Sequence, residues 1–293
     1  RLVSIVGNRP QFIKMSASAR AISALNESLV GDKIEDVVVN TGQHYDPLLS
    51  TSFFEEFDLS EPRYSLGCGG LSQINGLAQM LCGLESILAV ERPDFVIVYG
   101  DTTSTLAGAL AASRGGYRLV HIEAGLRSHN WSMPEEQNRV LADRVSNILF
   151  VPDVESRKLL FREGFPYQLQ PHGAQTIQVV GDIMLDVFIA TKGRWSRHDN
   201  FKRRRDYVFA TLHRRSLLED RSALRNVLTA LNDIQFRHAD VVLSMHPHLV
   251  TVVKSAGLEN LISSLCTQPP MSYLDTQRTI ANSIGVITDS GGV

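Results

Sequence analysis

Short apolar runs alternate with amphipathic segments along almost the whole chain. The runs are rich in β-branched residues, which predicts buried strands, and the segments between them space apolar residues three and four apart, which predicts helices. The strands that we expect lie at 1–6, 36–40, 95–99, 118–122, 148–151, 177–181, 207–211, 241–245, 261–264 and 285–288. Because strands that alternate with helices form parallel sheets, the pattern predicts an α/β protein.

The segment at 166–175 interrupts this alternation with two prolines and a glycine. We interpret it as a hinge between two Rossmann-like domains, residues 1–173 and 174–293, which face each other across a cleft. The chain ends at Val293, where the pattern calls for a helix to begin. We therefore expect the C-terminal part of the second domain to be missing.

Composition narrows the classes of function. The net charge of −2 argues against nucleic acid or a membrane surface as the main partner. Three cysteines far apart, with no CxxC spacing, suggest neither a disulfide framework nor a zinc site. Since no apolar run is long enough to span a membrane and no signal peptide is visible, the cytoplasm is the expected location.

Acidic residues follow two successive predicted strands. Asp101 comes after the strand at 95–99, Glu123 comes directly after the strand at 118–122, and Glu135 opens the helix after Pro134. Singly, each acid could cap a helix or complement its dipole. Acids are poor strand formers, however, and the carboxyl ends of parallel strands share one edge where ligands bind, so we favour a site.

Polar residues follow the first two predicted strands as well. Arg9 and Lys14 flank the start of a helix, where backbone N–H groups and the helix dipole suit an anion. Gln43 and His44 lie after the second strand, at the same edge. The alternative for the basic pair is two solvated surface residues.

In the second half of the chain, His213 and Arg214 follow one predicted strand and His246 follows the next. A histidine beside arginines at a strand end suggests proton delivery to an anion or stabilisation of its charge. The alternative is a solvated surface cluster. The chain closes on Ser290, Gly291 and Gly292, a composition typical of a phosphate-binding nest.

Nine short sequences, in order along the chain, resemble those of the non-hydrolysing UDP-N-acetylglucosamine 2-epimerases. They are GNRPQFIKM at 7–15, TGQHYD at 41–46, YGDTTSTLAGALAA at 99–112, HIEAGLRS at 121–128, MPEEQNRVLAD at 133–143, VVGDIMLD at 179–186, TLHRR at 211–215, HP at 246–247 and TDSGG at 288–292. The central sequences are highly specific, whereas GNRP and SGG are not.

The resemblance implies a glycosyltransferase B-type fold that binds a UDP-sugar, without a metal or another cofactor, and we expect a homodimer. By motif, the family's functional carboxylates fall on Asp101, Glu123 and Glu135, and its histidine falls on His213. The residues that we assign to substrate binding are Arg9, Lys14, Gln43, His44, Arg127, Arg139, Arg214, His246, Ser290, Gly291 and Gly292.

The implied reaction converts UDP-N-acetylglucosamine into UDP-N-acetylmannosamine by eliminating UDP to give 2-acetamidoglucal and adding UDP back. The acids suit the sugar ring, and the basic and glycine residues suit the diphosphate. Three alternatives stay open: epimerisation of a related 2,3-diacetamido uronic acid sugar, a hydrolysing epimerase that releases free N-acetylmannosamine, and an inactive sugar-nucleotide binder. A cation near Arg127 or Arg139 in the sugar site would favour the uronic acid.

Overall fold

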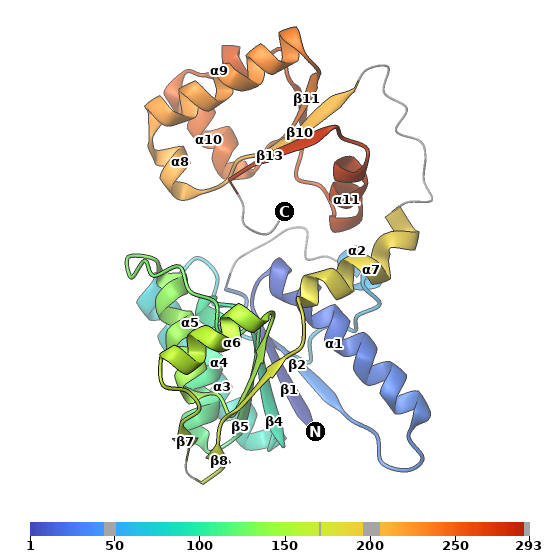
Figure 1. The fold of residues 1–293 in the computed structure, drawn as a ribbon, viewed down its shortest axis with the longest axis vertical. Coiled ribbons are helices and arrows are strands. Elements are labelled where there is room, and N and C mark those ends of the chain that lie inside the picture. Colours follow the sequence, from blue (N-terminus) through green and yellow to red (C-terminus); the bar gives the residue numbers. More distant parts are fainter. Residues whose placement is uncertain (44–50, 170, 196–205, 290–293) are drawn as a thin grey trace. The chain divides into compact units, whose positions relative to one another are not determined.

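The computed structural model describes residues 1–43, 51–169, 171–195 and 206–289. The predicted site residues His44, Ser290, Gly291 and Gly292 lie outside these ranges. The chain forms two compact units, Arg1–Ala190 and Thr191–Val293. Each unit contains a parallel sheet with helices against it, as the sequence predicts (Figure 1).

The sheet of the first unit has seven parallel strands in the order β3-β2-β1-β4-β5-β6-β9. Their bounds are β1 Leu2–Val6, β2 Asp36–Asn40, β3 Tyr64–Ser65, β4 Phe95–Tyr99, β5 Arg118–Ile122, β6 Ile148–Val151 and β9 Thr176–Val179. The helices are α1 Arg9–Ser28, α2 Thr51–Glu56, α3 Gln73–Glu91, α4 Thr103–Gly115, α5 Pro134–Val145, α6 Val154–Arg162 and α7 Ile183–Trp195. In Figure 1, α1 lies on one side of this sheet, and α3, α4 and α5 lie on the other.

Apolar side chains fill both faces of the first sheet. One core cluster joins β1 and β4 to α3 and α4 and includes Ile5, Val98 and Leu84, which are buried. On α1 and α2, Phe12 packs edge to face with Phe53 and Phe54. Because both faces are covered, polar groups of this sheet reach solvent at the strand ends.

The second unit contains a four-stranded parallel sheet in the order β12-β11-β10-β13. The strands are β10 Tyr207–Thr211, β11 Asp240–Ser244, β12 Cys266–Gln268 and β13 Gly285–Thr288. The helices are α8 Arg215–Glu219, α9 Arg221–Arg237, α10 Pro247–Ala256, α11 Tyr273–Ala281 and the 3₁₀ helix η1 Glu259–Leu261. Leucines of α9 and α10 pack on β10 and β11 and form the core of this unit.

The structure corrects two features of the predicted organisation. The segment at 166–175 is no hinge between the units: it contains the antiparallel pair β7 (Gln168–Leu169) and β8 (Gly173–Ala174), and β9 then pairs with β6 in the first sheet. The boundary between the units therefore falls after Ala190, within α7, rather than after residue 173.

The strand predicted at 261–264 was also wrong. Leu261 ends η1, and the fourth strand of the second sheet is β12 instead. Leu258, Leu261, Ile262 and Leu265 all pack in or against the second core, so their spacing of three and four residues reflects a helical turn rather than a strand.

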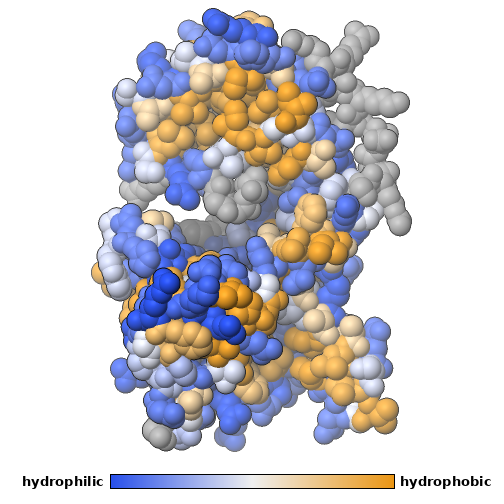
Figure 2. Space-filling view, viewed as in Figure 1, coloured by the Kyte–Doolittle hydropathy of each residue, from blue (hydrophilic) through white to orange (hydrophobic). Residues whose placement is uncertain are grey.

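Figure 2 shows hydrophilic and hydrophobic residues side by side on the same face of each unit, so the hydropathy of this surface adds little to the description of the fold. Among the described residues, no helix combines the length and apolar character needed to cross a membrane.

Candidate active site

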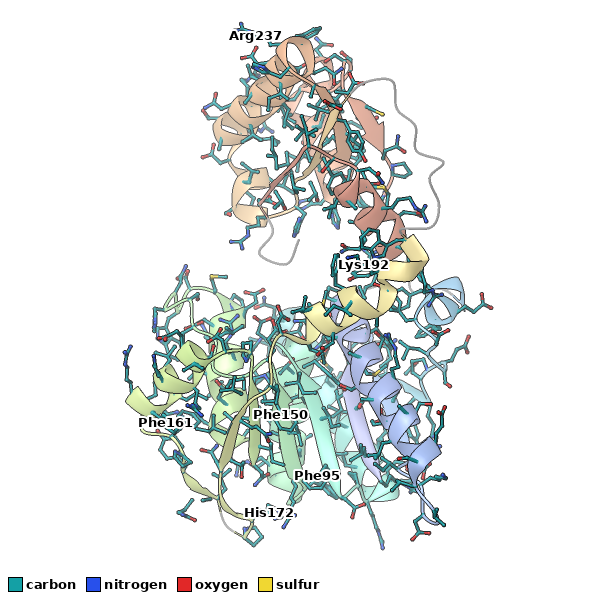
Figure 3. All side chains as sticks on the ribbon, turned by 45° about the vertical axis from the view of Figure 1, so that its right-hand side comes forward. Phe95, Phe150, Phe161, His172, Lys192 and Arg237 are labelled. Carbon is teal, nitrogen blue, oxygen red and sulfur yellow. The ribbon has the colours of Figure 1, made fainter. Side chains whose placement is uncertain are left out.

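The carboxyl ends of β4 and β5 bring two of the predicted acids to one edge of the first sheet. Phe95, labelled in Figure 3, begins β4 at the opposite edge. After Tyr99 the chain turns at Gly100, whose φ of 64° is left-handed, and Asp101 follows. β4 and β5 are paired in register from Phe95–Arg118 to Tyr99–Ile122, so Asp101 and Glu123 leave the sheet at neighbouring strand ends.

Glu123 forms an ion pair with Lys14 of α1. The two side chains are 23% and 16% exposed, so this pair is partly screened from solvent. Glu123 itself adopts a left-handed φ of 70°, which is unusual for a residue with a side chain. A Cβ atom on Gly100 would lie 3.3 Å from Lys14 Nζ and 3.4 Å from Glu123 Oε2, so the turn after β4 packs directly against this pair.

Asp101 forms an ion pair with Arg139 of α5. Arg139 Nη1 also donates to Glu136 Oε2 at 2.8 Å, so one guanidinium joins two carboxylates. Asn138 Nδ2 donates to the backbone carbonyl of Asp101 at 2.9 Å. Helix α5 therefore holds both the side chain and the backbone of the acid that follows β4.

The adjacent acids Glu135 and Glu136 have different environments. Glu136 is 2% exposed and accepts hydrogen bonds from the backbone N–H groups of Ser128 and His129, at 2.8 and 3.0 Å. Burial raises the Glu136 pKa, but these hydrogen bonds and Arg139 outweigh it and hold the pKa below its ordinary value. Glu135 is exposed, so of the two it is the acid that a ligand can reach.

Further residues predicted to bind substrate also make contacts within the protein. Gln43 Oε1 accepts from the backbone N–H and the hydroxyl of Ser104, at 2.9 and 2.8 Å, at the start of α4. Arg127, whose side chain is 1% exposed, pairs with Asp143 and Glu163. Lys14 pairs with Glu123, as described above. Arg9 is the first residue of α1, at the same edge of the sheet.

Sequence reasoning missed two buried residues next to this edge, His121 of β5 and Asp143 of α5. His121 Nδ1 lies 2.7 Å from Asp143 Oδ1, and its Nε2 lies 2.7 Å from the Gly100 carbonyl oxygen. Asp143 Oδ2 also accepts from the Gly125 N–H at 3.1 Å and from Arg127 at 2.6 Å. Both residues stand within the HIEAGLRS and MPEEQNRVLAD sequences, which was the available signal.

In the described part of the second unit, the predicted residues His213, Arg214 and His246 lie at the ends of β10 and β11, next to the end of β13. Asp289, which follows β13, accepts hydrogen bonds from the backbone N–H groups of His213 and Arg214, at 3.0 and 2.8 Å. His213 Nδ1 lies 3.2 Å from Asp289 Oδ1, and the ring of His213 lies 6.5 Å from that of His246. Asp289 therefore fixes the loop and orients the histidine, a role that the sequence prediction did not give it.

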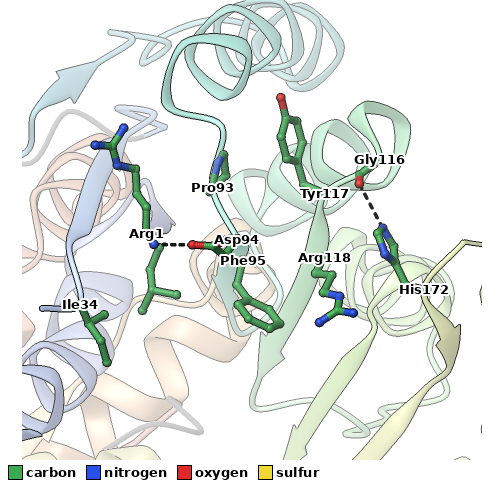
Figure 4. Close-up of a pocket in the computed structure, with 10 residues that line it drawn as sticks. Arg1, Ile34, Pro93, Asp94, Phe95, Gly116, Tyr117, Arg118 and His172 are labelled. Carbon is green, nitrogen blue, oxygen red and sulfur yellow. Dashed lines mark hydrogen bonds and ion pairs between the residues drawn. The ribbon is translucent and has the colours of Figure 1, made fainter. Parts of the chain in front are cut away.

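Two pockets among the described residues of the first unit lie away from this edge. One, of about 620 Å³, is at the amino edge of the sheet between Arg1, Phe95, Arg118 and His172 (Figure 4). Another, of about 510 Å³, lies between α3 and α4 and is lined by residues such as Leu81 and Leu110. Neither contains a predicted site residue, so we place the site by its chemistry at the carboxyl edge.

The chain is similar to known proteins in both sequence and fold. Residues 28–293 match the family model described as UDP-N-acetylglucosamine 2-epimerase. The UDP-2,3-diacetamido-2,3-dideoxy-D-glucuronate 2-epimerase of Pseudomonas aeruginosa is 39% identical over all of this chain and 79% of its own length. The UDP-N-acetylglucosamine 2-epimerase of Methanocaldococcus jannaschii is 33% identical over 100% of this chain and 79% of its own.

A crystal structure of the Methanocaldococcus jannaschii enzyme in complex with UDP-N-acetylglucosamine and UDP superposes with a TM-score of 0.86. It is 32% identical in sequence and covers 99% of this chain and 79% of that chain. Sequence, motif order and fold thus point the same way: the chain belongs to the UDP-N-acetylglucosamine 2-epimerase family.

Proposed function

We propose that the protein interconverts UDP-N-acetylglucosamine and UDP-N-acetylmannosamine by eliminating and re-adding UDP. The hydrogen at C2 of this sugar is not next to a carbonyl, so simple enolisation does not remove it. If a base takes the C2 proton while the C1–O bond breaks and UDP leaves with the electron pair, the product is 2-acetamidoglucal. Addition of UDP oxygen at C1 and of a proton on the opposite face of C2 then inverts C2.

The observation that carries the proposal is the set of acids at the carboxyl edge of the first sheet. Asp101 and Glu123 are each paired with one cation, and Glu135 is exposed in the first turn of α5, the helix that contacts Asp101 through Asn138 and Arg139. Such acids supply a proton acceptor, a proton donor and a charge that stabilises the electron-poor ring. The acids are proposed as a group, with no order among them.

In the second unit, His213, Arg214 and His246 suit the diphosphate, on which negative charge develops as the C1–O bond breaks. His213 has its Nδ1 against Asp289, an arrangement that directs the opposite ring nitrogen away from the loop. The predicted anion residue Arg9 is a further candidate for this role in the first unit.

The 39% identity to an epimerase of a 2,3-diacetamido glucuronate supports a second candidate substrate. A uronic acid would need a cation for its carboxylate. Arg127 is buried between Asp143 and Glu163, and Arg139 is shared by Asp101 and Glu136, so the charge of each is already balanced by carboxylates. This pairing supports the neutral N-acetylglucosamine sugar.

The deciding experiment offers both UDP-sugars to the full-length protein and identifies products by NMR. We expect UDP-linked N-acetylmannosamine from UDP-N-acetylglucosamine, with a higher kcat/KM than for the diacetamido uronate. The reverse preference would assign the protein to the uronic acid. Release of free N-acetylmannosamine would identify a hydrolysing enzyme, and no change at C2 of either sugar would leave only a binding role.

A further inference from the structure

His121 lies between two groups that only accept hydrogen bonds. It sits near the end of β5, is fully buried, and has Nε2 2.7 Å from the Gly100 carbonyl and Nδ1 2.7 Å from the Asp143 carboxylate. A carbonyl and an ionised carboxylate have no proton to donate. Both ring nitrogens must therefore carry hydrogen if both contacts are hydrogen bonds.

The alternative, a neutral imidazole facing a protonated Asp143, conflicts with the other contacts of that carboxyl group. Asp143 Oδ2 accepts from Arg127 Nη1 at 2.6 Å and from the Gly125 N–H at 3.1 Å. These donors favour the ionised form. With Glu163 on the far side of Arg127, two cations alternate with two carboxylates, so the buried charges of this chain of contacts balance.

The same contacts reach both strand-end acids. His121 holds the carbonyl of Gly100, and the Gly100 N–H donates to the Ile122 carbonyl at 2.9 Å, so the residue before Asp101 is held through both of its backbone polar groups. Asp143 holds the N–H of Gly125, two residues after Glu123. The turns that carry Asp101 and Glu123 thus depend on one buried pair.

We propose that His121, paired with Asp143, acts as the positioning residue for Asp101 and Glu123. It is buried from solvent and acts through the backbone of the two turns. The proposal deepens the proposed epimerase function and rests on it.

The positioning role is tested by kinetics. We expect His121→Gln to lower kcat about 10- to 100-fold, the range for residues that orient a functional group, with KM changed less than about twofold. Asp143→Asn, which keeps the shape of the partner but not its charge, should lower kcat in the same way. The control is His172→Gln, because His172 also donates to a glycine carbonyl, that of Gly116, at 3.0 Å, away from the candidate site. An unchanged kcat in either His121→Gln or Asp143→Asn, or a loss confined to KM, overturns the positioning role. If the wild type turns over neither UDP-sugar, it is the proposed function that fails, whereas an active wild type with an equally active variant overturns the positioning role alone.

Discussion

The guanidinium of Arg139 on α5 is paired with Asp101, the acid that follows β4. This contact fixes the carboxylate and balances its charge at the carboxyl edge of the sheet. We expect Arg139→Gln to lower kcat about 10- to 100-fold, since the acid would lose its orientation. Steady-state kinetics with UDP-N-acetylglucosamine measures the effect. Arg157→Gln, at an exposed position of α6, is the matched control and should leave kcat unchanged.

Turnover in D₂O tests the acids as proton carriers. If the C2 proton is removed by one acid and returned from another, the product should carry deuterium at C2. Asp101→Asn, Glu123→Gln and Glu135→Gln should each slow this exchange about 100-fold or more, because an amide accepts no proton. Glu155→Gln, an exposed acid on α6, should not. Product that retains the substrate hydrogen would remove these acids from the mechanism.

The neighbours Glu135 and Glu136 should respond in opposite ways. Glu135 is exposed, so Glu135→Gln should affect turnover and leave stability unchanged. Glu136→Gln removes a buried charge that accepts several hydrogen bonds, and should lower the free energy of unfolding by about 1.5–3 kcal/mol. Urea unfolding of both variants makes the comparison.

The Glu136 contribution should also depend on pH. The pKa of Glu136 in the folded protein lies below its ordinary value of 4.5. The stabilisation is therefore present above about pH 4.5 and is lost as the pH falls through the folded-state pKa. The difference in unfolding free energy between wild type and Glu136→Gln should shrink below pH 4.5, and a difference that grew there would contradict the assignment.

His213 and Asp289 should form a functional pair. We expect His213→Ala to lower kcat by about two orders of magnitude, the range for a general acid or a charge-stabilising contact. Asp289→Asn should have a smaller effect in the same direction, because its oxygen still accepts from the loop but no longer carries a charge beside Nδ1. His238→Ala, exposed at the end of α9, serves as the control. Near-normal turnover in His213→Ala would return His213 to a surface role.

The sequence alone predicted the strands that bear the site. Apolar runs bounded by glycine and polar residues predicted both ends of β4 and β5 correctly. A strand that is buried on both faces is apolar along its whole length, so the run and the strand coincide. The difference between Glu135 and Glu136 could not be read, because one step along a helix turns a side chain by about 100° and only packing decides which of the two is buried. The functional roles of the site residues stay predictions.

Ion pairs between side chains that are far apart in the sequence could not be predicted either. We assigned Arg127 to substrate binding. Its partner Glu163 lies far along the chain, and no local sequence pattern predicts that the two residues pair. The boundary between the units was misplaced for a related reason: β9 joins the first sheet by pairing with β6, and only the register of that pair shows it.

A comparison of two glycines distinguishes the effect of backbone strain on stability from an effect on activity. Gly100 and Gly116 both have a left-handed φ, 64° and 74°. A Cβ at Gly100 would meet Lys14 and Glu123, whereas one at Gly116 would meet nothing within 4 Å. Alanine at either position should cost about 1–2 kcal/mol of stability through the backbone alone. Only Gly100→Ala should also lower kcat, and an equal loss of kcat in Gly116→Ala would show that stability, not geometry, limits activity.

Glu123 occupies a left-handed conformation, with φ of 70°, that glycine would adopt without strain. For a residue with a side chain the cost is about 1–3 kcal/mol. A library selected only for heat resistance should therefore accept glycine at position 123 and discard the carboxylate with it. Thermal stability and turnover therefore favour different residues at position 123. A search for a more stable protein that is still active should keep Glu123 unchanged.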